Sequence, residues 1–249
     1  MNILITAGNT HAPIDRVRVV TNVFTGRTGA NLARTAWTRG HRVTLLTSHP
    51  ELVADLPTPG EDTDRRVTVV PYATFDELAG LLQAEVRATA YDALFHSAAV
   101  SDYLSAGVYA PAVGTVFSAR TRQWERNGVP PAMAEHKGGK IKSNEPELWF
   151  RMVRAPKLVD RLRTPWGFAG LLVKFKLEVG LTEAELLAVA EKSRVQSAAD
   201  LMVANSLDEA KHAAYLGPVG GRYERVPRRE LAERLLLTVE HLQRERGQP

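Results

Sequence analysis

The 249-residue sequence contains no cysteine. Disulfide bonds, thiolate metal sites and cysteine nucleophiles are therefore excluded. The sequence also lacks an apolar run near the roughly 20 residues that a membrane-spanning helix needs. Its first residues have neither the basic flank nor the long apolar core of a signal peptide. These absences favour a cytoplasmic protein with no membrane contact.

Positive charge exceeds negative charge only slightly, since the formal net charge is +4. The basic residues are spread along the chain, and a solvated arginine-rich surface is enough to explain them. No dense basic cluster of the kind that binds nucleic acid is present. We therefore expect small anionic ligands as partners and no nucleic acid.

Two common enzyme signatures are also missing. No G-x-G-x-x-G motif directly follows the first predicted strand, which disfavours a nicotinamide or flavin dinucleotide. A short-chain dehydrogenase needs Tyr-x-x-x-Lys, but Tyr103 is followed four positions later by Gly107. None of the seven histidines pairs with another at a convincing metal-ligand spacing, so no metal site is predicted.

Apolar runs alternate with amphipathic stretches along most of the chain, which is typical of a parallel sheet flanked by helices. The predicted strands are Asn2–Thr6, Arg42–Thr47, Val67–Val70, Tyr91–Ala98, Gly170–Lys176 and Asp200–Ala204. The predicted helices are Thr28–Arg39, Thr74–Thr89, Thr182–Ser193 and a final helix that opens at Pro227 and Arg228 and runs through Leu242. This order predicts an α/β fold with a Rossmann-like, doubly wound, mostly parallel sheet and helices on both faces.

We expect a single domain over residues 1–249. Residues 106–144 interrupt the alternation, because they are rich in Pro, Gly, Lys and Arg and show little periodicity. A long stretch of this kind is usually functional or mobile. We predict an irregular basic insertion that serves as a dimer arm or an active-site flap.

Glycines follow the first predicted strand and precede the first predicted helix. Gly8 lets the chain turn and lets a ligand approach the backbone. Gly26 and Gly29 precede a helix whose free N–H groups can hold phosphate. A plain turn between strand and helix is the alternative interpretation.

Three further segments carry polar chemistry at predicted strand ends or in loops. Small residues at Ala98 and Ala99 leave room for a ligand near the Asp102 carboxylate, although an Asp at a turn often caps it. The segment His136–Lys142 combines glycines with three lysines and could clamp a triphosphate or form an exposed basic loop. Phe175 could stack on a base or pack in the core, and Asn205 could bond a ring edge.

Taken in order, these segments resemble phosphopantothenate–cysteine ligase in its stand-alone form, without the flavin-binding decarboxylase domain. The matching segments are Thr6–Thr10, Ile14–Arg18, Asn22, Thr25–Gly29, Ala98–Tyr103, Lys140–Lys142, Arg154–Pro156, Phe175–Glu178 and Val203–Asn205. Asn9 stands where the family pattern has a second glycine, and Phe24 stands where it has a serine.

The resemblance implies a role for each matched residue. Asn22 would stabilise the acyl-nucleotide, and Lys140 would bind the nucleotide phosphates, so both are expected to be catalytic. Arg18 would reach the substrate phosphate of a partner subunit, which implies a homodimer. Substrate binding is implied for Arg18, Asn22, Ala98, Ala99 and Asp102. Nucleotide binding is implied for Gly8, Gly26, Gly29, Asp102, Lys140, Phe175 and Asn205.

The implied reaction joins phosphopantothenate to cysteine in coenzyme A synthesis. CTP or ATP would be cleaved to the monophosphate and pyrophosphate with Mg²⁺, and no flavin is expected. Lys137 lies close enough to compete with Lys140 for the triphosphate. Asn9 and Phe24 keep one alternative open, a non-catalytic homologue that binds nucleotide in a regulatory role.

Overall fold

The structure is a computed structural model that describes residues 1–57, 67–136, 139–141 and 144–247. Its contacts divide the chain into two compact units. Unit 1 comprises Met1–Thr10, Val23–Val100 and Lys157–Pro249, and unit 2 comprises His11–Asn22 and Ser101–Pro156. The assignment of one domain to residues 1–249 stays a prediction.

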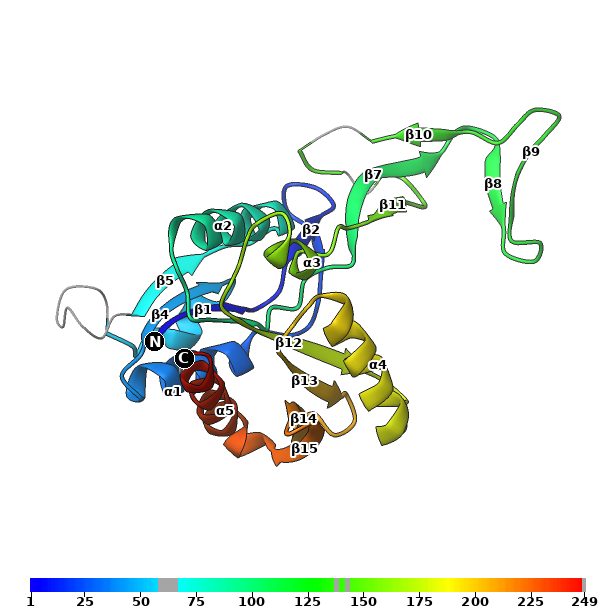
Figure 1. The fold of residues 1–249 in the computed structure, drawn as a ribbon. Coiled ribbons are helices and arrows are strands. Elements are labelled where there is room, and N and C mark those ends of the chain that lie inside the picture. Colours follow the sequence, from blue (N-terminus) through cyan, green and yellow to red (C-terminus); the bar gives the residue numbers. More distant parts are fainter. Residues whose placement is uncertain (58–66, 137–138, 142–143, 248–249) are drawn as a thin grey trace. The chain divides into compact units, whose positions relative to one another are not determined.

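Unit 1 contains an eight-stranded sheet in the order β15-β14-β13-β12-β6-β1-β4-β5 (Figure 1). The strands are β1 (Asn2–Ala7), β4 (Arg42–Thr47), β5 (Val67–Pro71), β6 (Ala93–His96), β12 (Leu171–Glu178), β13 (Leu201–Ser206), β14 (Ala213–Val219) and β15 (Arg222–Pro227). The strands from β13 to β5 are parallel, whereas β14 and β15 are antiparallel. The predicted mostly parallel sheet is confirmed.

Helices cover both faces of this sheet. They are α1 (Arg27–Thr38), α2 (Phe75–Ala88), α3 (Val159–Arg163), α4 (Glu183–Gln196) and α5 (Leu231–Arg246), with 3₁₀ helices at Pro50–Val53 and Arg228–Glu230. Side chains alternate between the two faces of each strand. Ile3, Ile5 and Phe95 share one buried cluster with α1 and α5, whereas Met202 and Ala204 pack with α4. The core therefore lies on both sides of the sheet.

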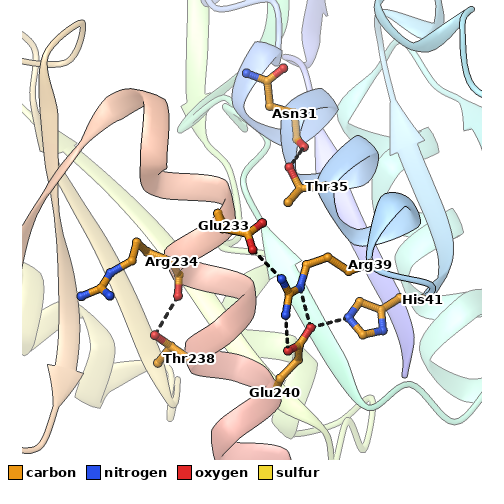
Figure 2. Close-up of polar contacts among 8 residues, drawn as sticks. All are labelled: Asn31, Thr35, Arg39, His41, Glu233, Arg234, Thr238 and Glu240. Atoms are coloured by element: carbon orange, nitrogen blue, oxygen red, sulfur yellow. Dashed lines mark hydrogen bonds and ion pairs between the residues drawn. The ribbon is translucent and has the colours of Figure 1, made fainter.

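An ion-pair network joins α1 to α5 (Figure 2). Arg39 donates two hydrogen bonds of 2.7 Å to the Glu240 carboxylate. His41 Nε2 lies 2.8 Å from the same carboxylate, and Arg39 also pairs with Glu233. This network holds α5 against the end of α1.

Capping boxes explain where two predicted helices begin. Thr74 accepts a hydrogen bond from the Glu77 amide and Glu77 bonds back at the start of α2, and Thr182 does the same with Glu185 at the start of α4. Such boxes satisfy N–H groups that a helix start leaves without partners. In the described residues no helix is both long and apolar enough to cross a membrane.

Unit 2 consists of short antiparallel strands. They are β2 (His11–Pro13), β3 (Val19–Thr21), β7 (Tyr103–Pro111), β8 (Thr115–Ser118), β9 (Gln123–Arg126), β10 (Met133–Glu135) and β11 (Trp149–Arg154). β2 pairs with β3, β8 with β9, and β7 with both β10 and β11. Residues 106–144, predicted as irregular, therefore include most of β7 and all of β8, β9 and β10. Strands of three or four residues are too short to show a period in the sequence.

Candidate functional site

The glycines predicted to bind nucleotide come together in unit 1. Gly8 and Gly26 have φ angles of +89° and +88°, a region that favours glycine. A Cβ on Gly26 would lie 2.2 Å from the Gly8 amide nitrogen. A Cβ on Gly29 would lie 2.5 Å from Ala7 Cβ. These positions lack side chains because the start of α1 packs directly on the end of β1.

The loop after β6 runs beside the loop after β1. The Ala98 amide donates to Thr6 Oγ1 at 3.2 Å, and the Ala99 amide donates to the Gly8 carbonyl at 2.8 Å. Asn9 forms a parallel bridge with Ala99, and its side-chain oxygen accepts from Ser48 Oγ at 3.1 Å. Ala98 and Ala99 thus lie with Gly8 at the carboxyl ends of β1 and β6.

Arg228 also belongs to this region, although the sequence indicated it only as the start of the final helix. It donates to Thr28 Oγ1 in the first turn of α1 and, at 3.0 Å, to Asn205 Oδ1 at the end of β13. Burial lowers the pKa of Arg228, but a guanidinium stays protonated in proteins. No acidic residue lies in the first turn of α1. The Arg228 guanidinium and the N-terminus of α1 would both favour the binding of an anion at this position.

Asn205 and Phe175 lie on the paired strands β13 and β12, where Asn205 is opposite Leu177 and Phe175 is opposite Val203. Besides Arg228, the Asn205 amide contacts two backbone carbonyls, those of Lys176 at 3.3 Å and Val203 at 3.4 Å. Phe175 is partly buried and packs against the main core cluster. The core interpretation of Phe175 is thus supported, and the nucleotide contacts of both residues stay predictions.

A second feature missed from the sequence is a buried polar row. Thr6, His96 and Lys174 lie in register on β1, β6 and β12. His96 Nδ1 lies 3.0 Å from Thr6 Oγ1. Burial, followed by the charge of Lys174, lowers the pKa of His96 to about 4, so the ring is neutral at pH 7. The alternation of side chains along β12 could have predicted that Lys174 is buried, because it places Lys174 on the same face of the sheet as buried Leu172.

In unit 2, Arg18 is held by its own loop. Its guanidinium donates to Asp15 at 2.5 and 3.0 Å and to the Ile141 carbonyl at 3.0 Å. The Arg18 bond is the first cause that lowers the pKa of the Asp15 carboxyl, and the Val17 amide is the second. Arg18 is thereby placed next to the segment that carries Lys140.

The other predicted residues of unit 2 are more exposed. Lys140 and Asp102 are exposed, and Asn22 is partly exposed directly after β3. The Asp102 carbonyl accepts from the Ala155 amide at 2.8 Å. Lys137 and Lys142 lie outside the described residues, so their competition with Lys140 stays open. The catalytic roles of Asn22 and Lys140 stay predictions.

Unit 2 also has an apolar hollow that no predicted site residue lines. Its volume is about 310 Å³, and its walls are Tyr109, Met133, Trp149, Phe150 and Arg151. Trp149 also belongs to an aromatic cluster with Phe117 and Trp124, with ring centroids 4.7 to 5.1 Å apart. Within the described ranges, no three His, Cys, Asp or Glu residues are grouped so that they could hold a metal ion.

Comparison with known proteins gives consistent results. Residues 1–111 match the model of a family described as DNA/pantothenate metabolism flavoprotein C-terminal domain. The chain is 30% identical over 247 residues to the coenzyme A biosynthesis bifunctional protein CoaBC of Thermococcus kodakarensis, covering 96% of this chain and 51% of that protein. The chain thus spans about half the length of this curated relative.

Solved structures extend the likeness along the chain. The DNA/pantothenate metabolism flavoprotein from Streptococcus pneumoniae is 26% identical with a TM-score of 0.73, and the match covers 97% of this chain and 99% of that one. A Cab2 mutant in complex with phosphopantothenate-cysteine is 18% identical with a TM-score of 0.67, covering 98% and 86%. The second likeness shows the fold alone.

Proposed function

We propose that this chain, a homologue of the C-terminal region of CoaBC, is a phosphopantothenate–cysteine ligase of coenzyme A synthesis. One observation carries the proposal. Four of the segments that match the ligase family follow or end strands of unit 1 at their carboxyl ends: Thr6–Thr10 at β1, Ala98 and Ala99 after β6, Phe175–Glu178 on β12 and Val203–Asn205 on β13. Ligands of open α/β sheets bind at that edge. The relationship to CoaBC over 96% of the chain supports the same assignment.

The reaction begins with a carboxylate, which is a poor electrophile. The phosphopantothenate carboxylate attacks the α-phosphorus of the nucleotide, and the bond to pyrophosphate breaks. The cysteine amine then attacks the acyl carbon of the mixed anhydride. The bond to the nucleoside monophosphate breaks, and the amine loses a proton as the amide forms.

Crowded negative charge is the main barrier to the first step, and cations must offset it. In unit 1, the glycine-lined start of α1 and the Arg228 guanidinium would hold phosphate oxygens. Lys140 is proposed to bind the triphosphate, and Asn22 to donate a hydrogen bond to the developing oxyanion. Both roles rest on the family resemblance.

We expect Mg²⁺ to enter with CTP or ATP. This ion usually keeps several waters and binds substrate phosphates with one or two carboxylates, not a full protein cage. When bound, the ion would neutralise phosphate charge. A cytoplasmic homodimer, in which Arg18 reaches the neighbour's substrate, completes the proposal.

A pyrophosphate-release assay tests the function. The protein is incubated with phosphopantothenate, cysteine and either CTP or ATP, and the product is identified by mass. We expect pyrophosphate release that depends on phosphopantothenate, and an amide product that depends on cysteine. Nucleotide binding without either product would instead support the regulatory homologue.

Asn22→Asp tests the mechanism within that assay. The mutation places a negative charge where a neutral donor is proposed, and loss of one such donor typically costs about 10²–10³ in rate. The variant should unfold at the wild-type temperature, because Asn22 lies in a partly exposed loop. A variant that melts normally and turns over within about threefold of wild type, well short of that loss, would remove Asn22 from the mechanism.

A further inference from the structure

Arg228 differs from the other partly buried arginines of unit 1 in its hydrogen-bond partners. Within the described ranges, the two groups that accept from its guanidinium are neutral, namely Thr28 Oγ1 and Asn205 Oδ1. The others each pair with a carboxylate, and they are Arg34, Arg39, Arg163 and Arg194. The guanidinium of Arg228 therefore serves something other than an ion pair between these elements.

The bond from Arg228 fixes the orientation of the Asn205 amide. A guanidinium can only donate hydrogen bonds, so the Asn205 atom that lies 3.0 Å from Nη1 must be the side-chain oxygen. The amide nitrogen then donates to the carbonyls of Lys176 at 3.3 Å and Val203 at 3.4 Å. Both bonds are longer than the roughly 2.9–3.0 Å of a typical N–H···O bond. The amide nitrogen is thus held weakly and can exchange these carbonyls for a better acceptor.

Asn205 and Phe175 share one face of the sheet. Val203 belongs to the core cluster formed with α1 and α5, and Asn205, two residues further along β13, points to the same face. Phe175 is opposite Val203 on β12 and packs against that cluster. Arg228 connects this end of β13 to Thr28 in the first turn of α1. One guanidinium therefore joins the predicted base contacts to the predicted phosphate site.

We propose that Arg228 is a positioning residue for nucleobase recognition, which holds Asn205 Oδ1 so that the amide nitrogen donates to a ring acceptor of the base. This inference rests on the proposed function, in which Asn205 and Phe175 contact the nucleotide. Cytosine and adenine both carry a ring nitrogen that accepts a hydrogen bond. Without Arg228 the amide can turn its oxygen toward the base, and two acceptors would then face each other.

Two other roles of Arg228 compete with this one, and Arg228→Lys separates them. Lysine keeps the positive charge but lacks the planar fork that bridges Thr28 and Asn205. If Arg228 only binds phosphate, or only braces α1 against β13, the variant should change the affinity for all polyphosphates alike. If Arg228 orients Asn205, the loss should be greater for ligands that carry a base. Arg229→Lys, the same substitution at the next and exposed position, is the matched control.

The experiment measures the dissociation constants of CTP, ATP and inorganic tripolyphosphate by calorimetry at pH 7 with Mg²⁺. The constant for tripolyphosphate divided by the constant for the tighter nucleotide gives the contribution of the nucleoside. We expect R228K to lower this ratio about threefold to tenfold, as for the loss of one neutral hydrogen bond, and R229K to leave it at the wild-type value. Asn205→Ala should lower the ratio by a similar factor. The double variant should lower it no further, because both changes remove the same bond to the base.

Three results would overturn the inference: an unchanged ratio in R228K, additive losses in the double variant, and equal wild-type affinity for tripolyphosphate and both nucleotides. If R228K does not fold, Arg228→Met takes its place, because the lost charge weakens all three ligands and cancels in the ratio. The titration needs no turnover. A ratio that depends on Arg228 in a protein without turnover would sink the ligase proposal alone, whereas turnover with an unchanged ratio in R228K would sink this inference alone.

Discussion

The contact between Gly26 and Gly8 leaves no space for a side chain. Gly26→Ala adds a methyl group 2.2 Å from the Gly8 nitrogen and also forces alanine to a positive φ. Gly180 is a matched control, because its φ is +70° but an added Cβ would meet nothing within 4 Å. We expect Gly180→Ala to cost about 1–2 kcal/mol from backbone strain alone.

Gly26→Ala should cost about 2–5 kcal/mol, because overpacking of about 1–3 kcal/mol adds to the same strain. Urea unfolding of both variants measures the difference. Equal losses at the two positions would mean that the start of α1 moves away from β1 without penalty. Such a result would contradict direct packing of the start of α1 on the end of β1.

His96 should make the stability of the protein depend on pH. Burial lowers its pKa to about 4, against 6.5 in an unfolded chain. Below pH 6.5 the unfolded state therefore binds more protons, and the free energy of unfolding falls as pH decreases toward 4, by up to about 1.4 kcal/mol per pH unit. Unfolding in urea at pH 7, 6 and 5 measures this slope. His96→Gln should flatten it, and a variant with the wild-type slope would show that His96 is not its source.

At the scale of elements, one carboxylate couples α5 to α1. Glu240 accepts from Arg39 and lies within hydrogen-bond distance of His41, as Figure 2 shows. Glu240→Gln should lower the free energy of unfolding by about 1.5–3 kcal/mol, the range for hydrogen bonds to a charged group. Glu233→Gln is the control, because Glu233 is half exposed and such pairs contribute about 0–1 kcal/mol. A similar loss in both variants would contradict a special role of Glu240.

The contribution of the Glu240 carboxylate to stability should decrease at low pH. The Arg39 bond is the first cause that lowers the pKa of Glu240 to about 2, from 4.5 in an unfolded chain. Its contribution to stability is thus complete above pH 4.5 and is lost as pH falls toward 2. The difference in unfolding free energy between wild type and Glu240→Gln should therefore shrink between pH 5 and pH 2.5. A constant difference over that range would place the effect of the mutation elsewhere.

The sequence predicted the elements of unit 1 that have a strong period or a clear boundary. Arg42–Thr47 is predicted and observed with the same bounds, and α4 extends three residues beyond its predicted end at Ser193. β14 and β15 were missed, because Gly217, Pro218 and the turn glycines interrupt their apolar pattern. The strands of unit 2 were missed because most are short and partly exposed, so that few positions carry a pattern.

The candidate site was predictable where backbone geometry demands a residue type and less so elsewhere. The sequence singled out Gly8, Gly26 and Gly29, and the structure shows tight packing that leaves no room for a side chain there, whereas their nucleotide contacts stay predictions. Lys174 and Arg228 were missed as buried cations, because only the three-dimensional neighbours reveal that their side chains turn inward. A lysine in a strand and an arginine before a helix are common on exposed surfaces.

At the scale of the molecule, we predict a homodimer in solution. The prediction rests on the role implied for Arg18, which is to complete the site of a neighbouring subunit. Sedimentation at micromolar concentration should show twice the chain mass. Arg18→Ala and Asn22→Asp should each lower turnover strongly, and an exchanged mixture of the two should regain part of it, because hybrid dimers contain one intact site. A fully active monomer would contradict the prediction.

Unit 2 is made of two separate inserts, His11–Asn22 and Ser101–Pro156, and the chain passes between the units after Thr10, Asn22, Val100 and Pro156. The inserts are joined by bonds from the Arg16 amide to the Gly139 carbonyl and from the Ile141 amide to Asp15. A chimera that exchanged only the longer insert with a relative would break this match. Whatever properties unit 2 confers must therefore be inherited, or transplanted, as two stretches of gene that change together.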